Sequence, residues 1–175
     1  MKDENVVRKR WSEDETVLAL YLYFQLSFGQ LHADNPEIQR LASTLGRSSN
    51  SVAMKLCNFA SLDPKITESG RKGLTGTSKL DRTIYAEFEQ NWTGLVERAE
   101  GIWALHIESA DKPETQLNES HAGFRFEPYQ GASTKRALVS QRIGQGFFRR
   151  AVLANFEETC CISGIADARL LVASH

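Results

Sequence analysis

Three side chains that could contact DNA fall on one face of a single expected helix. The apolar spacing predicts this helix from Ser48 or Ser49 to Phe59, and Ser51, Lys55 and Asn58 lie away from its apolar positions. Hydroxyl, ammonium and amide groups can hydrogen-bond to base edges and phosphates when such a helix enters the major groove. We therefore expect these three residues to be DNA contacts.

Cations at two other places could follow a phosphate backbone. Arg71 and Lys72 lie in the basic, glycine-flanked loop of residues 64–78. Arg142, Arg149 and Arg150 accompany a helical pattern later in the chain. Guanidinium and ammonium groups of this kind neutralise phosphates without reading sequence. We expect the three arginines to clamp phosphates; for the loop, a solvated linker is the simpler alternative.

Residues 142–175 carry a family resemblance. The stretch RIGQGFFRRAVLANFEETCCISGIADARLLVASH closely resembles the opening of an HNH endonuclease domain, in which a Phe- and Arg-rich helix leads into CCISG and then LLVASH. The segments NSVAMKLCNFASLDP and GLTGTSKLDR resemble the region that precedes such domains in bacterial proteins. The resemblance implies a ββα-metal unit, metal-dependent cleavage of DNA and, by analogy, a role in restriction or phage defence.

The same resemblance gives the terminal histidine a role. His175 matches the first motif histidine, which acts in the family as general base on the attacking water. A divalent metal such as Mg²⁺ would stabilise the charge that develops on the phosphate and the leaving group. The family's asparagine and second histidine would follow His175, and Ser174 is a poor metal ligand. We therefore expect a chain that is truncated at the motif histidine and inactive alone.

The elements that must position these residues begin with a helical trio. Ser12 and Glu15 form a capping box for a first helix that Gly29 can stop. A second helix, which Asn35 can cap, begins at Pro36 and ends at Gly46. With the third helix, the trio has helix-turn-helix spacing, and Asp63-Pro64 closes it. The Trp-Ser start and LGRSSNSVAMKL resemble Myb-like domains. The alternative is a plain three-helix bundle that binds no DNA.

The rest of the chain divides into three parts. An amphipathic pattern predicts one long helix from Ser78 to about residue 108, with a capping box at Ser78 and Asp81 and with Gly94 as its weak point. A linker covers 109–135, and 136–175 is the incomplete HNH part, with a strand expected at Leu170–Val172. The expected fold is mainly α: a helix-turn-helix-like unit at 1–63, a basic loop and long helix at 64–108, and the α+β start of a ββα-metal domain.

Composition narrows the classes of protein. The net charge of −1 argues against a uniformly basic coat, although residues 128–156 carry five basic and no acidic side chains. Three cysteines without a C-x-x-C pair favour a reducing, cytoplasmic compartment. We read Met54 and Cys57 as core residues, and Cys160 and Cys161 as small, partly buried residues of a strand. Neither a signal peptide nor a membrane span is visible. Double-stranded DNA is the expected partner, and a homodimer is compatible with the sequence.

Two other functions remain open at this point. One is a helix-turn-helix regulator whose C-terminal segment merely packs, which would bind duplex DNA with a steep salt dependence but never cut it. The other is a protein-interaction module built on the long helix, which would not bind DNA even at low salt.

Overall fold

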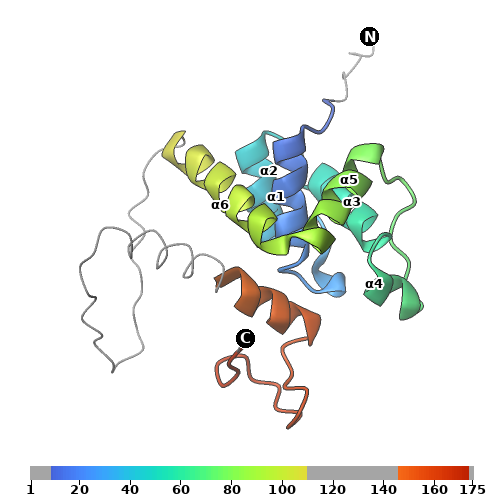
Figure 1. The fold of residues 1–175 in the computed structure, drawn as a ribbon, viewed down its shortest axis with the longest axis vertical. Helices are drawn as coiled ribbons and strands as arrows, with labels where there is room; N and C mark the ends of the chain where they lie inside the picture. The colour runs from blue at the N-terminus through green and yellow to red at the C-terminus, as the bar shows by residue number, and fades with distance from the viewer. Residues whose placement is uncertain (1–8, 110–145, 174–175) are drawn as a thin grey trace, which may run out of the picture.

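The computed structural model describes residues 9–109 and 146–173, and these ranges are mainly helical. Figure 1 shows the helices in chain order and a further helical segment at 146–155. The mainly α class is thereby confirmed. The elements are α1 (Glu13–Tyr23), η1 (Phe28–Gln30), α2 (Pro36–Leu45), α3 (Ser49–Ala60), α4 (Pro64–Glu68), α5 (Lys79–Gln90) and α6 (Trp92–Ser109).

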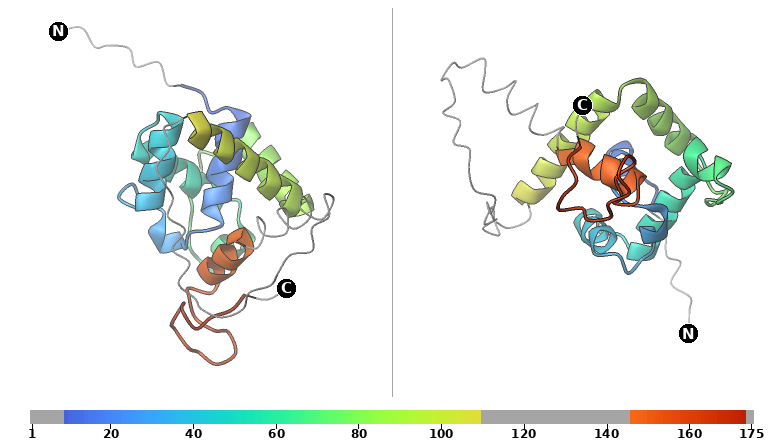
Figure 2. Two further views of the ribbon diagram at one scale, coloured as in Figure 1. Left: turned by 90° about the vertical axis from the view of Figure 1, so that its left-hand side faces the viewer. Right: turned by 90° about the horizontal axis from the view of Figure 1, so that it is seen from below.

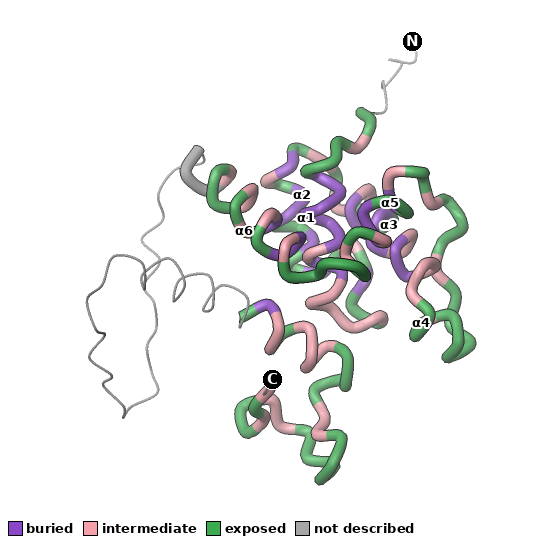
Figure 3. The backbone as a smooth tube through the Cα atoms, viewed as in Figure 1, coloured by how far each residue is buried: buried purple, intermediate pink, exposed green. Residues whose placement is uncertain are grey.

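Helix α1 is the centre of the fold. It packs against α2, α3, α5 and α6, which surround it on several sides (Figure 2). Val17, Ala19 and Leu20 are completely buried, and the buried backbone in Figure 3 concentrates on α1 and the helix faces turned toward it. A helix that is apolar on all sides belongs in the interior, which explains why α1 is enclosed.

The start of α1 and both ends of α2 follow the capping chemistry predicted from the sequence. The Ser12 hydroxyl accepts from the Glu15 backbone N–H at 3.2 Å, and the Glu15 carboxylate accepts from the Ser12 N–H at 2.9 Å. Asn35 caps α2, whose C-terminal Gly46 adopts a left-handed φ of 60°. A glycine tolerates this φ without steric cost, so the chain can reverse between α2 and α3.

One predicted boundary in this region is wrong. Helix α1 ends at Tyr23 rather than near Gly29, because residues 24–27 form a turn and Phe28 begins the short η1. Asp63 and Pro64 follow the end of α3 and start α4, since the Asp63 carboxylate caps the Lys65 N–H at 2.9 Å. Proline needs no N–H partner at a helix start, so Pro64 suits the first position.

The predicted long helix is two helices. Helix α5 ends at Gln90, and Asn91 leaves helical geometry with φ −149° and ψ 71°. The Asn91 side-chain oxygen then accepts from the Gly94 N–H at 3.1 Å and caps α6. A Cβ on Gly94 would come within 2.6 Å of the Asn91 amide nitrogen, so glycine leaves room for this cap. The break lets both helices pack on α1 and on each other.

One aromatic side chain of the C-terminal part is buried against the helical unit. Phe147, in the helical segment 146–155, is 3% exposed and stacks on Tyr21 of α1 with ring centroids 5.0 Å apart. Its ring also approaches Phe88 and Trp92. This contact attaches the segment to the end of the helical bundle (Figure 1).

The strand expected at Leu170–Val172 does not form. Residues 161–163 and 168–170 are turns, and the described ranges contain no strand at all. An extended segment needs a neighbouring strand for its backbone N–H and C=O groups, and the part of the chain that the structure describes places none beside this one. The apolar side chains of Ile162, Leu170 and Val172 are consequently more than two-thirds exposed. None of the helices in the described ranges is both long and apolar enough to cross a bilayer.

Candidate nucleic-acid interface

The outer face of α3 borders a shallow concavity of about 700 Å³. The N-terminal arm, the turn between α2 and α3, α3 itself and the loop before α5 all line it. Its lining is rich in hydroxyl and amide groups: Lys9, Trp11, Gly46, Arg47, Ser48, Asn50, Ser51, Met54, Lys55, Asn58, Gly76, Ser78 and Asp81. Asp81 is the acidic residue of this lining, and it is already paired with a lysine. A surface of this chemistry can meet an anionic, hydrogen-bonding partner.

Lys55 is not presented to a partner, which corrects its predicted role as a DNA contact. Its side chain is 5% exposed, and its ammonium donates to the Asp81 carboxylate at 2.6 Å. The ammonium also lies 4.6 Å from the centre of the Trp11 ring. A buried ammonium needs a counterion, so Lys55 is committed to joining α3 to α5.

Ser51 and Asn58 remain at the concavity but differ in freedom. Asn58 is partly exposed, and its amide donates to the Gly76 carbonyl at 3.3 Å. This hydrogen bond connects the loop before α5 to α3. Ser51 is partly exposed in the first turn of α3, where its backbone N–H donates to the Ser48 cap at 3.2 Å. Its hydroxyl remains a group that could contact DNA.

Two further residues of α3 were missed in the sequence. Asn50 is exposed, and Met54, which we expected in the core, is 58% exposed one helical turn later. The buried positions 52, 56 and 59 set the phase of the helix, and the opposite face centres on 50 and 54. The helical phase of the buried positions alone could have identified Asn50 and Met54. The prediction of Lys55 instead followed from its residue type.

Trp11 and an ionic cluster hold this face in place. The Trp11 ring lies between Lys55 and the guanidinium of Arg47, whose central carbon is 4.2 Å from the ring centre. Arg47 donates to the Glu15 carboxylate at 2.7 Å, and Lys9 donates to the same carboxylate at 2.8 Å. Burial raises the pKa of Glu15, but these hydrogen bonds outweigh burial and lower that pKa to about 2. The cluster fixes the entry of α1 against the turn before α3.

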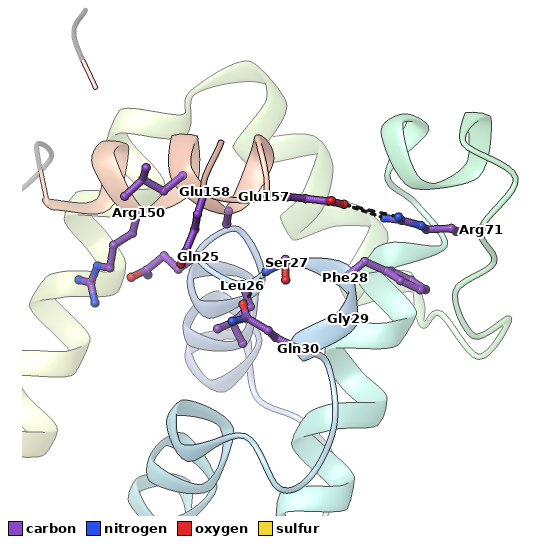
Figure 4. A pocket seen from close by; sticks show the side chains of 12 residues that line it. Gln25, Leu26, Ser27, Phe28, Gly29, Gln30, Arg71, Arg150, Glu157 and Glu158 are labelled. Carbon is purple, nitrogen blue, oxygen red and sulfur yellow. Dashed lines mark hydrogen bonds and ion pairs between the residues drawn. The ribbon is translucent and has the colours of Figure 1, made fainter. Parts of the chain in front are cut away.

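The predicted contacts in the basic loop lie elsewhere. Arg71 and Lys72 are exposed, and Arg71 lines a second pocket of about 700 Å³ beside residues 25–30. Figure 4 shows Arg71 reaching Glu157, with 3.5 Å between their charged atoms, while Arg150 lies at the far side of the pocket. Glu158 lines the pocket as well. Two acidic groups thus offset the two arginines, so this pocket is not a basic surface.

Of the three arginines expected to clamp phosphates, the structure describes two, and these two differ in their contacts. Arg149 donates to the backbone carbonyls of Ala168 and Leu171, so it holds the C-terminal segment to the helical segment 146–155. Arg150 is exposed and makes no hydrogen bond or ion pair within the described ranges. Arg142 lies outside the described residues.

The structure therefore separates the predicted contacts into two groups. Ser51 and Asn58 lie near Trp11, just before α1, whereas Arg71 and Arg150 line a pocket with the turn that follows α1. The 11 residues of α1 span about 16 Å at 1.5 Å per residue, so the groups lie at opposite ends of the central helix. This arrangement does not place both groups along one straight DNA backbone.

The nuclease-like residues cannot be assembled into a centre here. His175 and Ser174 lie outside the described residues, and no group of three His, Cys, Asp or Glu side chains in the described ranges is placed to hold a metal ion. Asp167 instead pairs with Arg169 at 2.7 Å. The described residues do not by themselves fit the divalent metal that the HNH resemblance implies.

The cysteine pair adopts a tight turn rather than the expected strand. The Cys160 N–H donates to the Ile165 carbonyl at 2.8 Å, and the Gly164 N–H donates to the Cys160 carbonyl at 2.9 Å. Hydrogen bonds from Ser163 to the sulfur lower the pKa of Cys160 to about 7. Cys57, by contrast, donates to the Leu31 carbonyl, and burial raises its pKa.

Comparison of the chain with protein-family models, curated proteins and solved structures finds no match.

Proposed function

We propose that this protein binds double-stranded DNA through the outer face of α3. The observation that supports this most is the α2–turn–α3 arrangement, in which a left-handed Gly46 reverses the chain and α3 keeps an exposed, hydrogen-bonding face. A second helix held in this way can enter the major groove with its N-terminal residues at the base edges. Asn50 and Ser51 lie in the first turn of α3. The side chain of an asparagine can form two hydrogen bonds to adenine.

The charges around α3 favour an anionic partner. Lys9, with 64% of its side chain exposed, borders the concavity, and Arg10, Lys79 and Arg82 are exposed on the adjoining elements. The acidic side chains nearby are occupied, because Glu15 binds Arg47 and Asp81 binds Lys55. The net charge of −1 belongs to the whole chain and does not describe this face.

We further propose that the DNA-binding part serves a metal-dependent endonuclease of the HNH type in the cytoplasm. This proposal is supported by the resemblance of residues 142–175, with His175 as general base and a divalent metal such as Mg²⁺ as cofactor. A role in restriction of foreign DNA is the wider context that the resemblance suggests.

Fluorescence anisotropy with a labelled random-sequence duplex tests DNA binding. We expect saturable binding at 50 mM salt that weakens at least tenfold by 200 mM, because phosphate contacts release counterions. The variant Asn50→Ala with Met54→Ala should weaken binding about tenfold or more, since both side chains face the partner. The variant Arg71→Gln with Lys72→Gln is the matched control at the other end of α1.

The control pair should change binding less than threefold. Wild-type protein that does not bind at low salt would overturn the proposal. A loss of binding confined to the Arg71 and Lys72 variant would equally overturn it, because the interface would then lie at the wrong end of α1.

A further inference from the structure

A third pocket, between α1, α2 and α6, has the chemistry of a small-ligand site. Its volume is about 480 Å³, which lies in the range of small-molecule pockets. Leu18, Leu22 and Leu41 give it an apolar floor, and Trp103 adds an aromatic wall. It lies away from the outer face of α3, and none of its lining residues lines the concavity there.

One carboxylate oxygen in this pocket lacks a donor. The Tyr21 hydroxyl donates to Glu100 Oε1 at 3.0 Å, which satisfies one oxygen of the carboxylate. Glu100 Oε2 is buried and has no hydrogen-bond partner within the described ranges. A buried acceptor without a donor is costly, so a ligand N–H group at this point would be bound favourably. Burial raises the pKa of Glu100, and this effect exceeds the opposite effects of the Tyr21 hydrogen bond and the Arg150 charge, which agrees with a carboxylate that is poorly solvated.

Two guanidinium groups border the same pocket. Arg40 lies over the Trp103 ring, with its central carbon 5.4 Å from the ring centre, and Arg150 reaches the pocket from the helical segment 146–155. Neither guanidinium has a hydrogen-bond or ion-pair partner in the described parts of the chain. Guanidinium groups bind phosphate oxygens through paired N–H donors.

We infer that this pocket binds a nucleotide, with an N–H group of the base at Glu100 Oε2, the base against Trp103 and the phosphate at Arg150 and Arg40. This ligand class meets all the unsatisfied groups at once, because it combines a flat apolar body, an N–H donor and an anion. The nucleotide has two sources: a free mononucleotide, or a nucleotide turned out of a DNA duplex, which requires only local unstacking. The second source rests on the proposed function, and the first does not.

Glu100→Gln is the sharpest substitution for this pocket. Its amide oxygen can still accept from Tyr21, but an NH₂ donor then replaces the acceptor at Oε2 and opposes the base. Arg150→Gln removes a guanidinium from an exposed side chain without disturbing the core. Glu89→Gln, on an exposed position of α5, is the matched control.

Isothermal titration of the full chain with dAMP, dCMP, dGMP and dTMP tests the free ligand. We expect at least one mononucleotide to bind, about tenfold weaker binding in Glu100→Gln, and no change in Glu89→Gln. The matching nucleoside, which lacks phosphate, should bind wild-type protein about as weakly as Arg150→Gln binds the nucleotide. Thermal unfolding of each variant confirms that it is folded.

Anisotropy with a duplex that carries one unpaired, extrahelical nucleotide tests the second source. Binding that exceeds that of the fully paired duplex, and loses this excess in Glu100→Gln, supports the inference even if no mononucleotide binds. The inference is overturned if Glu100→Gln changes neither kind of binding. Mononucleotide binding without binding of the paired duplex would overturn the proposed function alone.

Discussion

The two described regions of the chain are stabilised by different kinds of interaction. The unit of residues 9–109 has a core of completely buried side chains and buried, paired charges such as Lys55 with Asp81. Residues 146–173 contribute one buried hydrophobic side chain, Phe147, and rely on Arg149 and exposed pairs such as Arg71 with Glu157. Buried apolar area dominates stability, so the first region should unfold cooperatively and the second should detach at lower cost.

Breaking the buried ion pair should have the largest effect. Asp81→Asn keeps the shape and the contact with Ser78 but leaves the Lys55 ammonium buried without a counterion, which should cost about 3 kcal/mol of unfolding free energy. Adding Lys55→Met should restore most of that loss, because the uncompensated charge is gone. Urea unfolding measures both. A cost below about 1 kcal/mol for the single variant would show that the pair does not hold α3 to α5.

Removing the Phe147 ring should separate the two regions without unfolding the first. Phe147→Ala deletes the contacts with Tyr21, Phe88 and Trp92. We expect amide exchange in 146–155 to become at least tenfold faster, while the exchange of α1 and α3 changes little. Phe156→Ala, at a ring that is 46% exposed, is the control. Equal acceleration in α1 would mean that the regions form one cooperative unit.

The ionic cluster at Glu15 should make the first region sensitive to acid. Folding lowers the pKa of Glu15 from 4.5 to about 2, so the folded state binds fewer protons than the unfolded state between these values. The stabilisation is therefore complete above the unfolded pKa and is lost as the pH falls toward 2. Glu15→Gln should flatten the pH dependence of the urea midpoint in this interval. An unchanged slope would contradict the role assigned to Arg47 and Lys9.

The reactivity of the thiols should differ between the two regions, and this difference should have almost no effect on stability. Hydrogen bonds from Ser163 lower the pKa of Cys160, whereas burial raises the pKa of Cys57. Iodoacetamide at pH 7 should therefore label Cys160 at least tenfold faster than Cys57, because the thiolate is the reactive form. Peptide mass spectrometry follows the two rates. Similar rates would mean that the turn around Cys160 does not form in solution.

The sequence predicted local chemistry better than long-range pairing. The caps at Ser12, Asn35 and Ser78 depend on residues three or fewer positions apart, and all of them form. The burial of Lys55 depends on Asp81, which is 26 positions away, and no local pattern shows that the two meet.

The errors at Asn91 and Leu170–Val172 have different causes. An asparagine cap inside an apolar stripe competes with a continuous helix, and tertiary packing of both halves on α1 favours the break. A strand exists only with a partner, which the pattern of a single segment cannot supply. The sequence analysis also missed Asn50 and Met54 in the candidate site, because their exposure depends on the phase of α3 rather than on their residue types.

The most direct test of the proposed interface is to map it on the protein. Amide chemical shifts of ¹⁵N-labelled protein should change on addition of a short duplex, and we expect the changes to centre on the first turns of α3, Gly46 and Lys9. The turn of residues 25–30 and Arg71, at the other end of α1, should stay nearly unchanged. Changes that centre on that turn and Arg71, with α3 unaffected, would contradict DNA binding through α3.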